Sequence, residues 1–268
     1  MSIEGSITAL VTPMNEKGDL DYNSLEKLIN FQIDSGISGL VAVGTTGESA
    51  TIDFEDHIKL IEFFIKISNG RVHVIAGTGA NSTEEALHLT REAKNLGADA
   101  ALLVSPYYNK PPQEGIYRHH AKIADEVDIP QILYNVPSRT ASFIEPETVK
   151  RLSSHQNIMG IKDATGDMKN LSEVLKLCEE NIKSKNFFLY SGDDFSFLEF
   201  LKKGGHGTIS VTSNVVPEII SEICLLVQSD FPKAKQLDDQ IKNLNKSLFC
   251  ESNPIPVKWA LQQMGLIK

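Results

Sequence analysis

Short apolar segments alternate with longer amphipathic segments along most of the chain. The short segments are continuous apolar runs such as LVAV, AALLV and IMGI, which are typical of parallel strands covered on both sheet faces. The longer segments repeat apolar residues at spacings of three and four, as in 25–33 and 58–65, and this spacing predicts helices. The alternation therefore predicts an α/β fold built from repeated strand, loop and helix units.

Eight strands are predicted in this way. They are expected at 6–11, 39–43, 72–76, 98–104, 131–135, 157–162, 187–191 and 207–211. Their starts lie about 20 to 35 residues apart, close to the ~30 residues that a strand–helix–strand unit needs. Eight such units that close on themselves form a (β/α)8 TIM barrel, which is our preferred interpretation. A doubly wound open sheet is the alternative with the same alternation.

The predicted units end near residue 215, and a helical tail follows them. Stretches of helical character cover 213–228, 231–248 and 254–264. We therefore predict a catalytic (β/α)8 barrel over residues 1–215 and a short C-terminal helical region, packed on the barrel, over residues 216–268.

Composition and charge narrow the range of partners. The chain has 26 basic and 35 acidic side chains and a formal net charge of −9, so it would repel nucleic acid and anionic membranes. Its three cysteines lie far apart, and no apolar run is long enough for a signal sequence or a membrane span. These features favour a cytoplasmic protein that acts on a small molecule.

Polar side chains follow the predicted strands, at the barrel face where active sites gather. Lys162 ends an apolar strand, where burial favours a neutral amine that attacks a carbonyl and forms a Schiff base. Tyr134 ends the preceding strand and could transfer the protons, with Thr45 and Tyr108 as polar partners. The alternatives are a lysine that pairs with Asp163 or reaches out to solvent, and a tyrosine that only caps the barrel.

Two further features suit carboxylate binding. The loop GTTGE at 44–48 offers backbone and hydroxyl donors, and Arg139 offers a two-pronged donor, although a surface ion pair is its alternative. The GTG segment at 77–79 lacks the third glycine of a dinucleotide fingerprint, and the histidines lack zinc-site spacing, so we expect neither nicotinamide nor metal. Asp193 and Asp194 are expected to cap the helix that follows them, and a cation site is their alternative.

The order of these motifs resembles the dihydrodipicolinate synthase family, also called 4-hydroxy-tetrahydrodipicolinate synthases, of the pyruvate-dependent class I aldolases. The matching segments are TALVTPM, GTTGES, VIAGTGAN, SPYYNKP, YNVPSRT, GIKDATGD, SGDD, GGHGTISVTSNV and NPIPVKWAL. The arginine in YNVPSRT is typical of this family and is absent from N-acetylneuraminate lyases. Such a lyase or a keto-deoxy-sugar aldolase is the enzymatic alternative, and a ligand-binding barrel without catalysis is the non-enzymatic one.

The resemblance implies a lyase that condenses pyruvate, held as a Schiff base on Lys162, with L-aspartate 4-semialdehyde in the diaminopimelate route to lysine. It implies no cofactor beyond this covalent imine. It makes Tyr134 the proton donor and acceptor, with a relay through Thr45 and Tyr108. Because Tyr108 would come from the neighbouring subunit, the smallest active unit would be a homodimer, and a homotetramer is expected. The substrate-binding residues that it implies are Thr46, Arg139, Gly192 and Ile209.

The resemblance also implies a lysine-inhibitor site at a dimer interface. The corresponding positions are Ser49, Ala50, His57, Asn81, Glu85 and Tyr107. Phe54 stands where lysine-sensitive members carry a histidine, and this removes a polar contact. Sensitivity and insensitivity to lysine are therefore both open.

Overall fold

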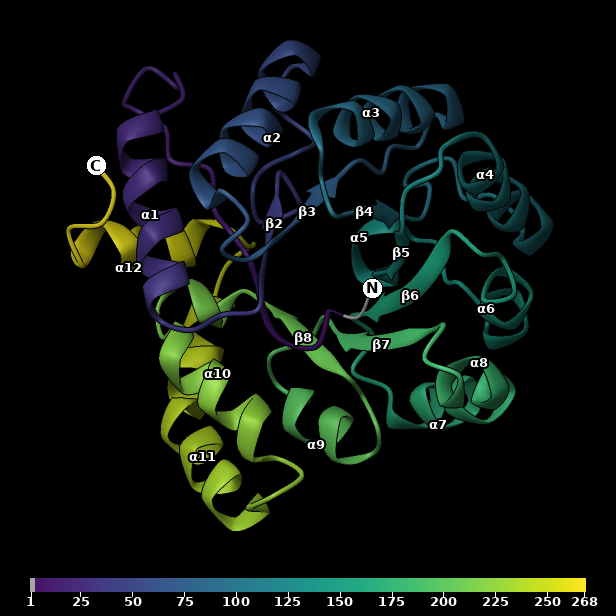
Figure 1. Cartoon of the computed structure of the whole chain (residues 1–268). Helices are drawn as coiled ribbons and strands as arrows, with labels where there is room; N and C mark the ends of the chain where they lie inside the picture. Colours follow the sequence, from purple (N-terminus) through teal and green to yellow (C-terminus); the bar gives the residue numbers. More distant parts are fainter. Residues whose placement is uncertain (1–2) are drawn as a thin grey trace.

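Eight parallel strands form a closed barrel, and helices surround it (Figure 1). The computed structural model describes residues 3–268. The strands are β1 (Gly5–Ala9), β2 (Gly39–Ala42), β3 (His73–Gly77), β4 (Ala100–Val104), β5 (Gln131–Asn135), β6 (Ile158–Asp163), β7 (Phe188–Ser191) and β8 (Gly207–Ser210). Each strand pairs with its neighbours in chain order, and β8 closes on β1. The predicted (β/α)8 barrel is confirmed, and every predicted strand end lies within two residues of the observed one.

Helices connect the strands, and most of them form the outer layer of the barrel (Figure 1). They are α1 (Tyr22–Asp34), α2 (Phe54–Ser68), α3 (Thr83–Leu96), α4 (Gln113–Glu126), α5 (Pro137–Thr140), α6 (Pro146–Leu152), α7 (Met168–Leu177), α8 (Glu179–Lys183) and α9 (Phe197–Lys202). Several begin with side-chain caps, as where Asp53 accepts from the Asp56 N–H and Ser82 from the Glu85 N–H. In the part of the chain that the structure describes, no helix combines the length and apolarity needed to cross a membrane.

The C-terminal region consists of a short 3-10 helix and three α-helices. They are η1 (Thr212–Asn214), α10 (Pro217–Leu226), α11 (Phe231–Leu248) and α12 (Ile255–Gln263). The single helix expected over 213–228 is thus divided, because Pro217 fits the first turn of a new helix but not the interior of a longer one. Helix α10 packs against both β1 and α11, so it joins the barrel to α11 (Figure 1).

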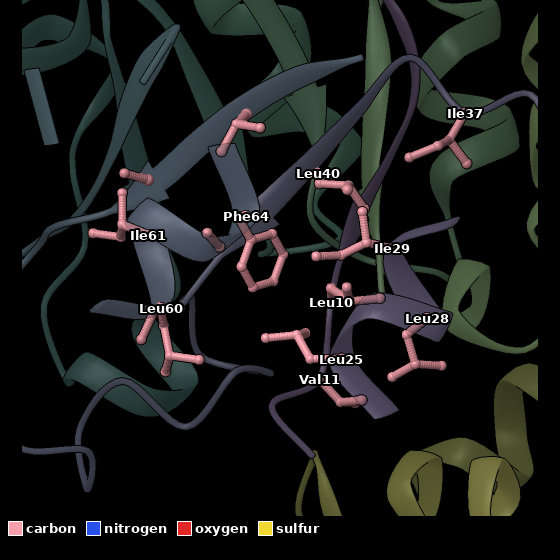
Figure 2. Close-up of a cluster of buried hydrophobic side chains, with 14 of the residues drawn as sticks. Leu10, Val11, Leu25, Leu28, Ile29, Ile37, Leu40, Leu60, Ile61 and Phe64 are labelled. Carbon is pink, nitrogen blue, oxygen red and sulfur yellow. The ribbon is translucent and has the colours of Figure 1, made fainter. Parts of the chain in front are cut away.

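The strands carry apolar side chains on both faces. One buried cluster, which includes Ile7 and Val41, fills the barrel interior. A second cluster packs the outer face of β2 against α1 and α2, where Leu40, Ile29 and Phe64 meet (Figure 2). Because Phe64 is fully buried, its replacement by alanine would cost about 3–5 kcal/mol of stability.

The expectation for Asp194 is wrong. Its Oδ2 accepts hydrogen bonds from the backbone N–H groups of Val211 and Thr212, both at 2.9 Å, so it caps the turn after β8 and not α9. Helix α9 begins at Phe197, and its N-terminus has no side-chain cap, so the same expectation for Asp193 is also wrong. Burial raises the pKa of the Asp194 carboxyl. Asp194 therefore ties the loop after β7 to the loop after β8, a contact that chain order does not indicate.

Candidate active site

Lys162 and Tyr134 lie side by side at the C-terminal ends of β6 and β5. They are register partners in the parallel ladder, and Lys162 Nζ is 4.3 Å from the centroid of the Tyr134 ring. The two residues are only 5% and 6% exposed. The structure thus brings the predicted amine nucleophile and the predicted proton donor into contact.

The alternative in which Lys162 pairs with Asp163 is not observed in the described chain. Successive residues of a strand point to opposite sides, so the two side chains diverge. Asp163 Oδ2 accepts from Asn170 Nδ2 at 2.7 Å, and its Oδ1 accepts from the Thr165 N–H at 3.1 Å. Burial raises the pKa of the Asp163 carboxyl, whereas these hydrogen bonds oppose the shift. Asp163 therefore anchors the loop after β6 and leaves the Lys162 amine without a carboxylate partner.

Gly192, which follows β7, lies directly against the Lys162 side chain. A Cβ atom at this position would be 2.8 Å from Lys162 Cε and 2.9 Å from Ala164 Cβ, which is closer than Cβ contacts allow. Only glycine lets the backbone approach the lysine this closely. Ile209, the other residue expected to bind substrate through its backbone, lies in the buried cluster that contains Tyr134.

A cavity of about 390 Å³ opens at the rim of the barrel. Thr45 and Arg139 line it, whereas Lys162 and Tyr134 are not among its lining residues and are more deeply buried. The predicted site residues therefore divide into a buried pair on the strands and a more open group on the loops.

Five of the six predicted inhibitor-site residues line this same cavity. They are Ser49, Ala50, His57, Glu85 and Tyr107. The sixth, Asn81, hydrogen-bonds Tyr107 through its backbone, while burial and the Glu85 charge raise the Tyr107 pKa. Phe54 also lines the cavity and packs edge-on against His88, with ring centroids 4.7 Å apart. The geometry brings these residues together, and their role in lysine binding stays a prediction.

Tyr108 differs from the other predicted catalytic residues because it is 89% exposed. Its φ of +73° lies in the left-handed region, which is strained for a tyrosine. This chain alone does not enclose the Tyr108 side chain, so its place in the relay with Thr45 stays a prediction.

The sequence reasoning gave no role to the C-terminal segment 253–258, which forms part of the cavity wall. Asn253 and Pro254 line the cavity. The Arg139 guanidinium donates to the Asn253 backbone oxygen at 2.9 Å, and Asn253 Nδ2 donates to Thr46 Oγ1 at 3.0 Å. Asn253 belongs to the NPIPVKWAL motif, so the motif was recognised while the spatial role of its first residue was missed.

A metal site would require several His, Cys, Asp or Glu side chains close together. Among residues 3–268, no cluster of three or more His, Cys, Asp or Glu side chains is arranged to hold a metal ion.

The architecture and the motifs agree with a known family. A family model described as the dihydrodipicolinate synthetase family matches residues 2–268. The chain belongs to this family. The resemblance drawn from the motifs is thereby confirmed over nearly the whole sequence.

Relatives and solved structures place the chain within the family at high identity. Proteins named 4-hydroxy-tetrahydrodipicolinate synthase from Alcanivorax borkumensis and Pseudomonas aeruginosa are 53% and 54% identical, over 99% of this chain and 89% of each relative. The chloride-inhibited dihydrodipicolinate synthase of Acinetobacter baumannii, solved with pyruvate, is 50% identical, with a TM-score of 0.96, over 100% of this chain and 90% of that one.

Proposed function

We propose that the chain is a 4-hydroxy-tetrahydrodipicolinate synthase that joins pyruvate to L-aspartate 4-semialdehyde. One observation carries this proposal: the buried Lys162 amine, which has no carboxylate partner within residues 3–268, lies against a tyrosine on the adjacent strand. Such an amine attacks carbonyl carbons, and such a tyrosine transfers the protons. The names of its family relatives support the same reaction.

The reaction begins when Lys162 Nζ attacks the C2 carbonyl of pyruvate, and water leaves as the imine forms. Tyr134 supplies and removes the protons, with Thr45 and Tyr108 as the relay. Loss of a proton from C3 gives an enamine, whose C3 bonds to the aldehyde carbon of the second substrate. The amine of that substrate then attacks the imine carbon, which closes the ring and releases Lys162. These steps require no external cofactor.

The two carboxylates of the substrates need separate donors. Thr46 would hold the pyruvate carboxylate, with Gly192 and Ile209 contributing backbone groups beside Lys162. Arg139 at the cavity rim would hold the carboxylate of aspartate semialdehyde through its planar donor pair. Because a sugar aldehyde has no carboxylate at this position, Arg139 favours the amino-acid aldehyde over the substrate of a sialic-acid lyase.

The proposal is tested by trapping the imine. The protein is incubated with pyruvate and borohydride, and its intact mass is compared with that of Lys162→Ala. We expect a pyruvate-sized adduct on the parent and on Lys169→Ala, an exposed-lysine control, but none on Lys162→Ala. A folded parent that forms no adduct would overturn the proposal and leave a barrel that binds without chemistry.

A second assay identifies the aldehyde. Other pyruvate aldolases also form an imine that borohydride traps, so the adduct does not identify the aldehyde. Turnover is therefore measured with aspartate semialdehyde and, separately, with N-acetylmannosamine. We expect a cyclised product from the first and none from the second. The opposite result would favour the N-acetylneuraminate lyase alternative.

We also infer that the active unit is a homodimer, since Tyr108 projects away from its own chain. Lys162→Ala and Tyr108→Phe chains are each expected to be almost inactive. If Tyr108 serves the partner's site, co-expressed chains form hybrids with one intact site, and activity returns to about a quarter of the wild-type value. No recovery would mean that each chain uses its own Tyr108. A cytoplasmic role in lysine biosynthesis, and assembly into a tetramer, complete the proposal.

A further inference from the structure

The C-terminal segment 253–258 contacts the loop 44–48 at two points. Asn253 Nδ2 donates to Thr46 Oγ1 at 3.0 Å, and Lys258 Nζ lies 2.6 Å from Glu48 Oε1. In the same segment, the Asn253 backbone oxygen accepts a hydrogen bond from the Arg139 guanidinium at 2.9 Å. Asn253 therefore touches both residues to which the substrate carboxylates are assigned.

The direction of the Asn253–Thr46 hydrogen bond decides what Thr46 can do. A hydroxyl has one hydrogen and two lone pairs, so it can accept one hydrogen bond and still donate another. Because Asn253 Nδ2 can only donate, Thr46 Oγ1 accepts from it, and the Thr46 hydrogen is free for a second partner. A carboxylate can only accept. The bond from Asn253 thus leaves Thr46 in the donor state that the pyruvate carboxylate requires.

The Oδ1 atom of the Asn253 amide shows that stability alone does not explain why an asparagine stands at this position. Asn253 is 9% exposed, and its Oδ1 is shielded from solvent without a hydrogen-bond partner in residues 3–268. A buried acceptor without a partner destabilises the folded state relative to an apolar group of similar shape. The amide is therefore retained at a stability cost, and its one observed side-chain hydrogen bond is the one to Thr46.

We propose that Asn253 is a positioning residue that holds the Thr46 hydroxyl as a hydrogen-bond donor toward the carboxylate of pyruvate. This inference rests on the proposed function, because it assumes that Thr46 binds pyruvate. The main-chain contact with Arg139 is independent of the Asn253 side chain, so side-chain replacements act on the pyruvate subsite and spare the second one.

The proposal predicts an unusual order of variants. Asn253→Ala removes the donor and leaves Thr46 free to rotate. Asn253→Asp preserves the shape but turns the donor into an acceptor, which would take the Thr46 hydrogen and point a lone pair at the substrate. Pyruvate binding should therefore weaken from Asn to Ala to Asp. A role in filling space predicts the reverse order for the two variants, because aspartate is the better fit.

The experiment measures steady-state kinetics for both substrates in Asn253→Ala, Asn253→Asp and the control Ser252→Ala, an exposed neighbour. For Asn253→Ala we expect the pyruvate KM to rise about 10-fold, with the kcat and the KM for aspartate semialdehyde changed less than about 3-fold. Asn253→Asp should raise the pyruvate KM further. Ser252→Ala should match wild type, and thermal melting confirms that each variant is folded.

A double-mutant cycle tests whether Asn253 acts through Thr46. In a Thr46→Val background the hydroxyl is absent, so Asn253→Ala should have no additional effect on the pyruvate KM. Additive effects, an Asn253→Asp variant with a lower pyruvate KM than Asn253→Ala, or equal increases in both KM values would each overturn the inference. Failure of the proposed function is distinguishable, because the wild-type protein would then form no borohydride-trapped pyruvate adduct at all.

Discussion

The floor and the outer wall of the site are built in different ways. The floor consists of Lys162 and Tyr134, which are neighbours on two hydrogen-bonded strands of the barrel. The wall consists of the loop 44–48 and the segment 253–258, whose contacts join residues 207 and 210 positions apart in the chain. The reacting groups thus lie on the rigid sheet, while the groups that orient substrate depend on a distant segment.

This difference separates chemistry from substrate positioning. Strand positions are fixed by the hydrogen-bonded ladder and by packing on both sides, so they hold catalytic geometry precisely enough for proton transfer. The wall is held by a few polar side-chain contacts between segments far apart in the chain, which open at lower free-energy cost than a barrel strand. Changes in the floor should therefore abolish turnover, and changes in the wall, apart from the relay residue Thr45, should mainly alter substrate affinity.

The largest expected effect is that of removing the floor amine. Lys162→Met should reduce kcat by about 10,000-fold or more, as expected for loss of a covalent nucleophile. Its free energy of unfolding, measured in urea, should be unchanged or higher, because burial of the polar Lys162 side chain, which has no carboxylate partner within residues 3–268, costs stability. Residual turnover within about 100-fold of wild type would mean that another group carries the chemistry.

The second prediction concerns a substitution that displaces the floor amine without removing it. In Gly192→Ala the new Cβ would collide with Lys162 Cε, so kcat/KM should fall about 10- to 100-fold. Overpacking should also destabilise the protein by about 1–3 kcal/mol. The control is Gly70→Ala, where φ is +71° and the Cβ meets open space. It should cost about 1–2 kcal/mol through backbone strain with no loss of activity. Equal kinetics for the two variants would contradict the contact between Gly192 and Lys162.

The same division explains what the sequence could predict. Lys162 and Tyr134 were identifiable because each ends an apolar run, and successive strands of a barrel are neighbours. Asn253 was not identifiable, because a contact across 207 positions leaves no periodic signal. Asp194 was misassigned for the same reason, since its partners are backbone groups on the next strand's loop. Periodicity locates elements and their ends, whereas contacts between distant loops require the folded structure.

The third prediction concerns a substitution that weakens a contact in the wall and leaves the floor intact. The Lys258–Glu48 ion pair is about three-quarters buried, with side chains 24% and 26% exposed. Lys258→Met should raise the pyruvate KM about 3-fold, keep kcat within 2-fold, and cost about 1 kcal/mol of stability. In a double-mutant cycle with Glu48→Gln, the coupling should be about 0.5–1 kcal/mol and should shrink in high salt. A fall in kcat with an unchanged KM would contradict the separation of wall from floor.

The smallest effect on activity is expected in the outer helix layer. The acid sensitivity of this layer sets the pH at which the protein unfolds, and activity changes in the floor and the wall are compared with it. His119 and His120 of α4 are buried edge to face, with ring centroids 5.0 Å apart. Burial lowers the pKa of His119 to about 4 and holds that of His120 well below its usual value. Both His120 ring nitrogens lack partners within residues 3–268.

These histidines make the fold sensitive to acid. Below pH 6.5 the histidines of the unfolded chain bind protons that the native state does not. The free energy of unfolding is therefore highest above that pH and falls as the pH decreases toward 4. His120→Phe should reduce this slope by about 1.4 kcal/mol per pH unit, while turnover at pH 7.5 stays within 2-fold. Urea denaturation at pH 7.5, 6.0 and 5.0 measures the slope. If wild type and variant lose activity at the same low pH although only wild type unfolds there, the loss arises in the active site and not in the helix layer.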